Sequence, residues 1–224
     1  METKILAVAF IDLEDYTGRS YKIPREKLLK LLDTYDNLIE SIFPEFGGKI
    51  VKKIGDSFMV VFESPTNAVL CGIEVQNTIF KHNKEVDGSD MLRVKIAIDL
   101  GEVHIRKGDV FGDVVNIASR LEKIAQIDDI YFTDAVYFAM NKAEIPSIFV
   151  GQKKFKGIPR IIRIFKVLGE YSHLLKKRKE CARTKKKIFF WFLTICILSL
   201  FIFWGLYLNI FSLDFIKNIF NFFR

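Results

Sequence analysis

Asn116 and Arg120 stand four residues apart in the stretch that runs from Gly108 to Arg120. The apolar residues of this stretch recur at helical spacing, so a helix would place both polar side chains on one face, within reach of one ligand. An amide can hold a sugar and a guanidinium can hold a phosphate, so the pair suggests a nucleotide. The competing interpretation is an amphipathic helix with a solvated arginine, and the rest of the chain must decide between them.

Two aspartates suggest a second kind of chemistry. Asp12 stands near the end of the apolar run 4–13, where a carboxylate is costly unless it is paired or holds a cation. Asp56 follows Gly55 between two strand-like runs, 49–54 and 57–62, which predict a β-hairpin. If the two carboxylates converge, they form a site for a hard cation of the Mg²⁺ kind. An acidic surface turn at Asp12 and a simple turn residue at Asp56 remain the alternatives.

The elements that must position these residues alternate between the strand period and the helix period. We expect helices from Pro24 to about Phe43, from Pro65 to about His82, through the motif at 114–121, and from Thr133 to Met140. We expect the later strands at 93–100, at 102–105 after a turn at Gly101, and at 130–132, 149–155 and 161–167. This order predicts an α+β domain of the ferredoxin-like, split βαβ kind, with a mostly antiparallel sheet and helices on one face.

Charge separates the chain into two parts. Of its 34 Lys+Arg and 27 Asp+Glu, residues 168–224 hold 10 and 3, which leaves 24 and 24 for residues 1–167. The net charge of +7 therefore belongs to the tail, and the neutral domain argues against a nucleic-acid-binding protein. The three cysteines and three histidines are scattered, so we expect reduced thiols and no histidine metal site.

The tail has the pattern of a membrane anchor. Eight of the twelve residues 176–187 are Lys or Arg, and residues 188–208 contain no charged side chain. A run of about 20 uncharged apolar residues is long enough to cross a bilayer. A basic segment beside it predicts contact with anionic lipid and a cytoplasmic N-terminal domain. We therefore divide the chain into a domain at 1–168, a basic segment at 169–187, a transmembrane helix at 188–208 and an apolar tail at 209–224.

Three ordered motifs carry a resemblance to a known family. The sequences FIDL at 10–13, KKIGDSF at 52–58 and DVFGDVVNIASRLE at 109–122 resemble the class III nucleotidyl cyclase catalytic domain, and FKGIP at 155–159 resembles its closing motif. The resemblance covers roughly residues 4–167. It implies that Asp12 and Asp56 bind two Mg²⁺ or Mn²⁺ ions, which assist attack of the 3′-hydroxyl of a nucleoside triphosphate on its own α-phosphate.

The same resemblance implies roles for the remaining candidates. Asn116 would orient the ribose, Arg120 would neutralise charge developing on the α-phosphate, and Lys156 would contact the terminal phosphates. Lys52 and Asp109 would read the base: a donor suits adenine N1 and an acceptor suits its 6-amino group, whereas guanylate cyclases place Glu and Cys there. The site would lie between two chains, so the resemblance implies a homodimer that converts ATP to cyclic AMP and pyrophosphate.

The sequence departs from the family at Asp15-Tyr16, where Gly-Phe is usual beside the bound phosphates, and it places the apolar run after the catalytic domain. Two alternatives stay open. One is a cyclase with another product, such as cyclic GMP, cyclic UMP or cyclic CMP. The other is a non-catalytic, membrane-bound dimerisation or nucleotide-sensing module, which the full set of candidate residues argues against.

Overall fold

The computed structural model describes residues 2–168, together with Leu200 and Trp204. The chain divides into two compact units, residues 1–175 and 176–224, and the first of these contains the folded domain. The predicted transmembrane helix, the basic segment and the apolar tail lie outside the described residues, apart from those two positions. In the part of the chain that the structure describes, no helix has the length and hydropathy needed to cross a membrane.

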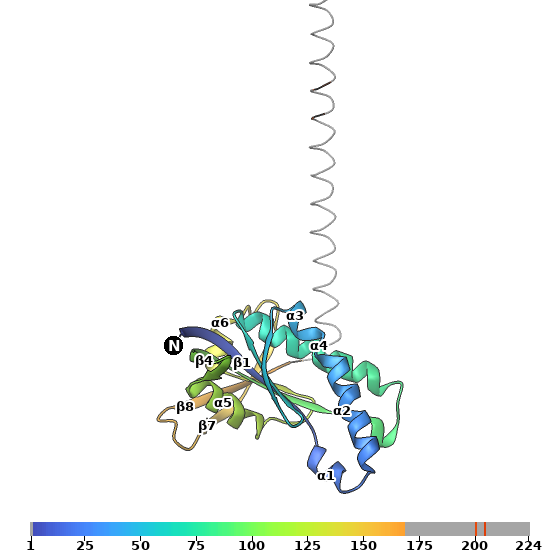
Figure 1. Cartoon of the computed structure of the whole chain (residues 1–224). Helices are drawn as coiled ribbons and strands as arrows, with labels where there is room; N and C mark the ends of the chain where they lie inside the picture. The colour runs from blue at the N-terminus through green and yellow to red at the C-terminus, as the bar shows by residue number, and fades with distance from the viewer. Residues whose placement is uncertain (1, 169–199, 201–203, 205–224) are drawn as a thin grey trace, which may run out of the picture. The chain divides into compact units, whose positions relative to one another are not determined.

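One eight-stranded sheet organises the domain (Figure 1). Its strand order is β2-β3-β1-β4-β6-β8-β7, β5 pairs with β4, and β4–β6 is the one parallel pair within it. The strands are β1 (Glu2–Leu13), β2 (Lys49–Ile54), β3 (Ser57–Phe62), β4 (Val94–Arg106), β5 (Asp109–Phe111), β6 (Ile130–Thr133), β7 (Ser147–Lys154) and β8 (Ile161–Val167). The helices are α1 (Tyr16–Ser20), α2 (Arg25–Ile39), α3 (Ile42–Glu45), α4 (Pro65–Asn83), α5 (Asp113–Glu122) and α6 (Asp134–Ala139), with a 3₁₀ turn at Gly88–Asp90.

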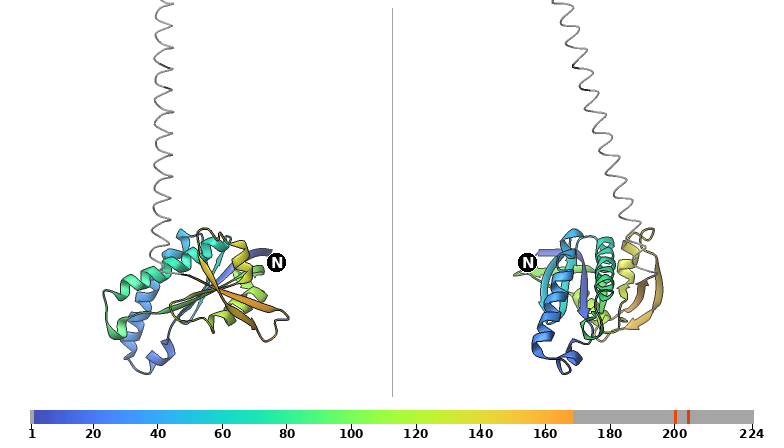
Figure 2. Two further views of the ribbon diagram at one scale, coloured as in Figure 1. Left: turned by 180° about the vertical axis from the view of Figure 1, so that it is seen from behind. Right: turned by 90° about the vertical axis from the view of Figure 1, so that its right-hand side faces the viewer.

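The sheet has a core on each of its faces. Successive side chains of a strand point to opposite faces, and along β4 the side chains of Val94, Ile96 and Ile98 join the larger cluster beneath α2 and α4. Ala97 and Val103 join the smaller clusters beneath α5. α2 and α4 accordingly lie on one side of the sheet and α5 on the other (Figures 1 and 2). The mostly antiparallel α+β prediction is confirmed, but the expectation that the helices lie on one face is wrong, because the motif helix α5 covers the second face.

Two predicted element boundaries are wrong. The helix expected from Pro24 to Phe43 ends at Ile39, and α3 follows as a separate turn. Pro44 has no N–H to continue the ladder and its ring would clash with a helical backbone. Gly101, expected to be a turn, lies inside the continuous strand β4 and pairs with Leu6 of β1. A Cβ there would lie 2.8 Å from a methyl carbon of Val114, so glycine serves the close approach of α5 to the strand.

A buried carboxyl group lies on the α5 face of β4. The side chain of Asp99 is 0% exposed, and its Oδ1 accepts a 2.5 Å hydrogen bond from the Thr133 hydroxyl. Its Oδ2 has no hydrogen-bond partner. Burial raises the pKa of Asp99 to about 6, although Thr133 and the Leu100 backbone favour the ionised form. Folding therefore disfavours the charged carboxylate.

This shift predicts a pH-dependent stability. Below about pH 4 the Asp99 carboxyl group is protonated in both the folded and the unfolded chain, so its burial does not lower the free energy of unfolding. Between about pH 4 and 6 the carboxyl group ionises in the unfolded chain first, so the free energy of unfolding falls as pH rises. The cost is fully present above the folded pKa and amounts to about 3 kcal/mol, because one pKa unit corresponds to about 1.4 kcal/mol. We expect Asp99→Asn to gain about that much free energy of unfolding relative to wild type between pH 4 and pH 7.5.

Urea unfolding at the two pH values measures this gain. Asp87→Asn, at an exposed site, makes the same chemical change and should show no such gain. A difference between wild type and Asp99→Asn that stays constant with pH would contradict the expectation.

Candidate active site

Strand register brings the two candidate metal-binding aspartates together. Asp12, near the end of β1, pairs with Ser57 of β3, and Asp56 is the residue before Ser57 in the β2–β3 turn. Gly55 has a φ of 64°, a conformation that glycine adopts without strain, and this allows the tight turn. Burial and then the charge of Asp12 raise the pKa of Asp56, which reports how near the two carboxylates lie.

This acidic pair fits a divalent cation. Mg²⁺ is commonly held by one or two carboxylates together with substrate phosphates and waters. Asp12 near the end of β1 and Asp56 at the hairpin tip supply two such carboxylates, and the charge repulsion between them is the kind that a cation relieves. Among the described residues no group of three or more His, Cys, Asp or Glu side chains forms a fuller metal site. The arrangement suits an ion that completes its coordination with a phosphate-bearing substrate.

Lys95 connects Asp12 to α5, a contact that the sequence patterns do not predict. Lys95 pairs with Asp12 across β1 and β4, and its Nζ lies 3.2 Å from Asp12 Oδ2 and 2.6 Å from a carboxylate oxygen of Glu122. Burial disfavours the ammonium, but the hydrogen bonds to Glu122 and Asp12 outweigh it and raise the pKa of Lys95. A cation is thereby fixed beside the acidic pair.

A second ion pair borders the site from α2. The ammonium of Lys53 donates to the carboxylate of Asp36, and the Tyr35 hydroxyl donates to the Ile11 carbonyl at 3.3 Å. Burial, and then the charges of Asp12, Asp56 and Asp36, raise the pKa of Tyr35. α2 therefore contributes a neutral phenol and a paired carboxylate behind the hairpin tip.

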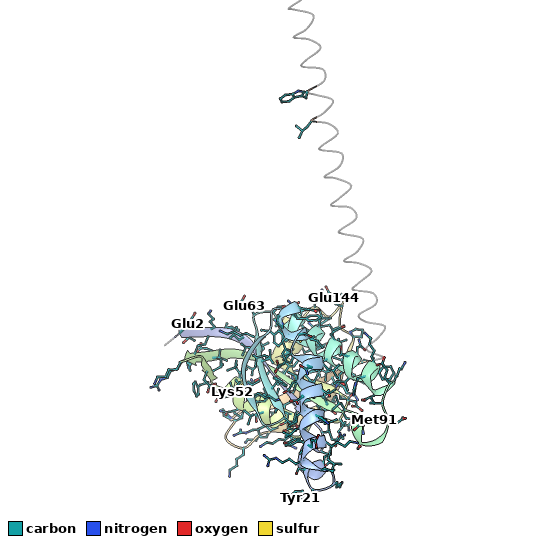
Figure 3. The ribbon with its side chains drawn as sticks, turned by 45° about the vertical axis from the view of Figure 1, so that its right-hand side comes forward. Glu2, Tyr21, Lys52, Glu63, Met91 and Glu144 are labelled. Carbon is teal, nitrogen blue, oxygen red and sulfur yellow. The ribbon has the colours of Figure 1, made fainter. Side chains whose placement is uncertain are left out.

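The two candidate base-reading residues form an ion pair within one chain. Lys52 Nζ lies 2.8 and 2.7 Å from the two carboxylate oxygens of Asp109, although 57 residues separate them in sequence. β2 and β5 position these side chains, and in the view of Figure 3 Lys52 lies on the opposite side of the domain from Met91. The Lys52 hydrogen bond and the Val110 N–H lower the pKa of Asp109. A donor and an acceptor are thus presented side by side.

α5 carries the other two candidates on one side, as predicted. Asn116 is exposed, and the guanidinium of Arg120 donates to the Lys156 carbonyl in the loop between β7 and β8. The Lys156 side chain is itself exposed. The helix and the loop are therefore tied together near the exposed candidates. Among the described residues, no hydrogen bond or ion pair joins Asp12 or Asp56 to Asn116 or Arg120.

The departure at Asp15-Tyr16 has a local explanation. Asp15 adopts a left-handed conformation, with φ 55°, at the start of α1. Its carboxylate lies over Gly18, where an added Cβ would come within 1.9 Å of Oδ1, and it is 3.8 Å from Lys22 Nζ. The extra carboxylate is thus directed to its own helix turn and to Lys22.

Comparisons with known proteins identify the family of the folded domain. The family described as "Adenylate and Guanylate cyclase catalytic domain" matches residues 2–170. An adenylate cyclase of Streptomyces coelicolor is 30% identical over 57% of this chain and 32% of its own length. The first three curated relatives are covered over only 17%, 28% and 32% of their length.

Two solved structures are similar in fold and sequence. The adenylate/guanylate cyclase/hydrolase from Silicibacter pomeroyi is 26% identical, with a TM-score of 0.67, covering 76% of this chain and 99% of that one. The adenylyl cyclase CyaB from P. aeruginosa is also 26% identical with a TM-score of 0.67, covering 75% and 97%. The described domain therefore belongs to the adenylate and guanylate cyclase catalytic domain family.

Proposed function

We propose that this protein is an adenylate cyclase that converts ATP to 3′,5′-cyclic AMP and pyrophosphate. The observation that carries the proposal is the Lys52–Asp109 pair, which sets a lone donor beside a lone acceptor at 2.7–2.8 Å. Adenine offers the complementary acceptor at N1 and donor at its 6-amino group, whereas guanine offers the reverse at both positions. An acidic pair, a fixed lysine and a partly buried arginine supply the other groups that cyclisation of a triphosphate needs.

Each residue has a task in that reaction. Asp12 and Asp56 would hold divalent cations, which lower the pKa of the attacking hydroxyl and offset the charge of the triphosphate when bound. Asn116 orients the ribose so that its 3′-oxygen faces the α-phosphorus. Arg120 stabilises the negative charge that develops on the α-phosphate oxygens as the bond to pyrophosphate breaks. Lys156 and Lys95 neutralise the phosphates of the leaving group.

Base selectivity gives a prediction with a clear direction. Lys52→Glu alone would set a second carboxylate against Asp109, so the exchange must be double, Lys52→Glu with Asp109→Cys. We expect the ratio of kcat/KM for ATP to that for GTP to fall on the order of 100-fold, because each mismatched buried donor or acceptor loses its partner. Initial rates with each nucleotide measure the ratio. Lys49→Glu, an exposed charge reversal on the same strand, should leave it unchanged.

The product itself tests the proposal. The full chain, solubilised in detergent, is given ATP, GTP, CTP and UTP together with Mn²⁺, and its products are identified by mass spectrometry. Cyclic AMP as the dominant product is the expected result. A cyclic pyrimidine nucleotide or cyclic GMP would show that the Lys52–Asp109 pair is misinterpreted. No cyclic product from a dimeric sample would favour a non-catalytic nucleotide-sensing module.

The active form in this proposal is a homodimer anchored in a membrane. One chain would supply Asp12 and Asp56 and the other Asn116 and Arg120, giving two equivalent sites. The anchor rests on the sequence of residues 188–208, and it would hold the domain at the cytoplasmic surface with residues 176–187 against anionic lipid. Resistance of the full chain to alkaline carbonate extraction from membranes tests the anchor, and release into the supernatant would contradict it.

A further inference from the structure

A pocket of about 500 Å³ lies on the α5 face of the sheet. β4 forms its floor, the first turns of α5 form one wall, and the loop just before β8 forms the other. A volume of this size is in the range of small-molecule sites in proteins. The residues that line it are Asp99, Leu100, Gly101, Glu102, His104, Gly112, Asp113, Val114, Ile117, Ile158, Pro159 and Arg160.

The alternation of β4 directs the Asp99 side chain toward this pocket. Ala97, two residues earlier on the strand, contacts the cluster that contains Ile117, and Gly101, two residues later, faces Val114. Side chains two apart on a strand share a face. Asp99 therefore points between them, toward α5, and it is one of the residues that line the pocket.

One atom in this floor lacks a partner. Asp99 is 0% exposed, Thr133 donates to its Oδ1, and its Oδ2 has no hydrogen-bond partner. A buried acceptor left without a donor is costly, so native proteins rarely leave one unsatisfied. A ligand that donates a hydrogen bond to this oxygen would remove that cost.

The charges around the pocket favour a cationic donor. Asp113, at the start of α5, adds a second carboxylate to Asp99. Of the two basic residues, Arg160 lies 3.8 Å from Asp134 Oδ1 and its charge also lowers the pKa of Asp99, whereas the His104 ring lies 3.1 Å from the Thr3 hydroxyl. The remaining wall is apolar, with the side chains of Val114, Ile117, Ile158 and Pro159.

We propose that this pocket, named here the Asp99 pocket, binds a small organic cation: an ammonium or amidinium group on a compact apolar body. The charged nitrogen donates to Asp99 Oδ2, and the apolar body packs against Ile117 and Ile158. Charge-assisted hydrogen bonds of this kind are among the stronger ones. The pocket is separate from Asp12, Asp56, Lys52 and Asp109, none of which line it.

The walls of the pocket belong to the same elements as the candidate active-site residues, so a bound ligand could affect the site. Ile117 lies beside Asn116 on α5, and Ile158 is two residues from Lys156, whose carbonyl accepts from Arg120. A molecule held between these walls contacts both elements that carry the proposed catalytic groups. We therefore expect a ligand bound in the Asp99 pocket to change the rate of cyclic nucleotide production. This consequence rests on the proposed cyclase activity, whereas binding of the ligand does not.

Methyl NMR on the full chain in detergent tests binding. With isoleucine δ1 methyl groups labelled, benzylammonium chloride should shift Ile117 and Ile158 saturably, and leave Ile39 and Ile73 of the opposite core unmoved. Benzyl alcohol, a neutral molecule of similar shape, should bind at least about tenfold more weakly. Equal binding of the two compounds, or shifts confined to other methyl groups, would overturn the proposal.

A matched pair of variants tests the anchor residue. Asp99→Asn keeps the shape but removes the charge, and it should raise the Kd for benzylammonium about tenfold or more. Asp87→Asn removes a charge from an exposed loop and should leave the Kd unchanged. Unaltered affinity in folded Asp99→Asn, judged by its methyl spectrum, would refute the role of Asp99.

Turnover is then measured with and without saturating benzylammonium. A change of about twofold or more that is absent in Asp99→Asn supports a regulatory pocket. Binding that leaves cyclic AMP production unchanged would refute the regulatory role. Binding by a protein that makes no cyclic nucleotide would refute the proposed function and leave the pocket intact.

Discussion

Asp56→Ala should lower turnover on the order of 10³-fold or more while the chain keeps its fold and oligomeric state. Asp56 and Asp12 are the two carboxylates proposed to hold the divalent ions, and those ions would supply charge stabilisation of the reaction worth several kcal/mol. The substitution leaves the turn glycine, Gly55, in place, so the β2–β3 hairpin should form normally.

The effect on stability distinguishes a functional carboxylate from a structural one. Burial and the charge of Asp12 both raise the pKa of Asp56, so the fold disfavours its ionised form. Removing it should leave the thermal midpoint unchanged or raise it. Asp33→Ala, on the exposed side of α2, is the control for loss of an acid and should keep full activity.

Production of cyclic nucleotide, size-exclusion chromatography with light scattering and thermal melting form one set of measurements. Turnover that survives Asp56→Ala would mean that the metal assignment is wrong. A large fall in the thermal midpoint would mean that Asp56 supports the fold instead.

Sequence patterns predicted most of the helices and strands because interactions between residues close together in the sequence form those elements. The β2–β3 hairpin follows from two strand-like runs around Gly55, and α4 begins where Ser64 accepts a hydrogen bond from the Asn67 N–H, just before Pro65. The failures are of another kind. Gly101 has the composition of a turn, but pairing with β1 and the approach of α5 keep it in a strand. Tertiary contacts overrode a local preference there.

The candidate site divides in the same way. The two aspartates were predicted from a strand end and a turn, and β1–β3 register makes them neighbours. The sequence did not indicate Lys95 as a site residue, because a lysine on an alternating strand is equally well explained as a solvated side chain. Its role appears only when β4 pairs with β1 and places its ammonium 3.2 Å from Asp12. Asp99 also looked like an ordinary strand residue, and its burial depends on α5 and β8.

Arg120→Ala should by itself abolish most activity, and mixing it with Asp56→Ala should restore a defined part. In the proposed homodimer each site takes the aspartates of one chain and the Asn116–Arg120 pair of the other. A mixed dimer then has one site with both defects and one site with none. Random mixing makes half of the dimers mixed, so the mixture should recover about a quarter of wild-type activity.

This test is needed because the structure of one chain is compatible with two arrangements, a site within a single chain and a site shared between two chains. Lys95 connects Asp12 to Glu122, two residues beyond Arg120 on α5, which brings the end of that helix toward the metal-binding pair. Yet the Arg120 guanidinium donates a hydrogen bond to the Lys156 carbonyl. Among the described residues, no hydrogen bond or ion pair joins Arg120 to either aspartate. A site shared between two chains does not require these groups to bond within one chain.

Co-expression with two different affinity tags isolates the mixed dimer and sharpens the expected result to about half of wild-type activity per dimer. Two chains that both carry Asp56→Ala and Arg120→Ala provide the inactive control, since that dimer has no intact site. If the purified mixed dimer is as inactive as this control, the aspartates and the arginine act within a single chain. In that case the Lys95–Glu122 connection, and not the dimer interface, brings the catalytic groups together.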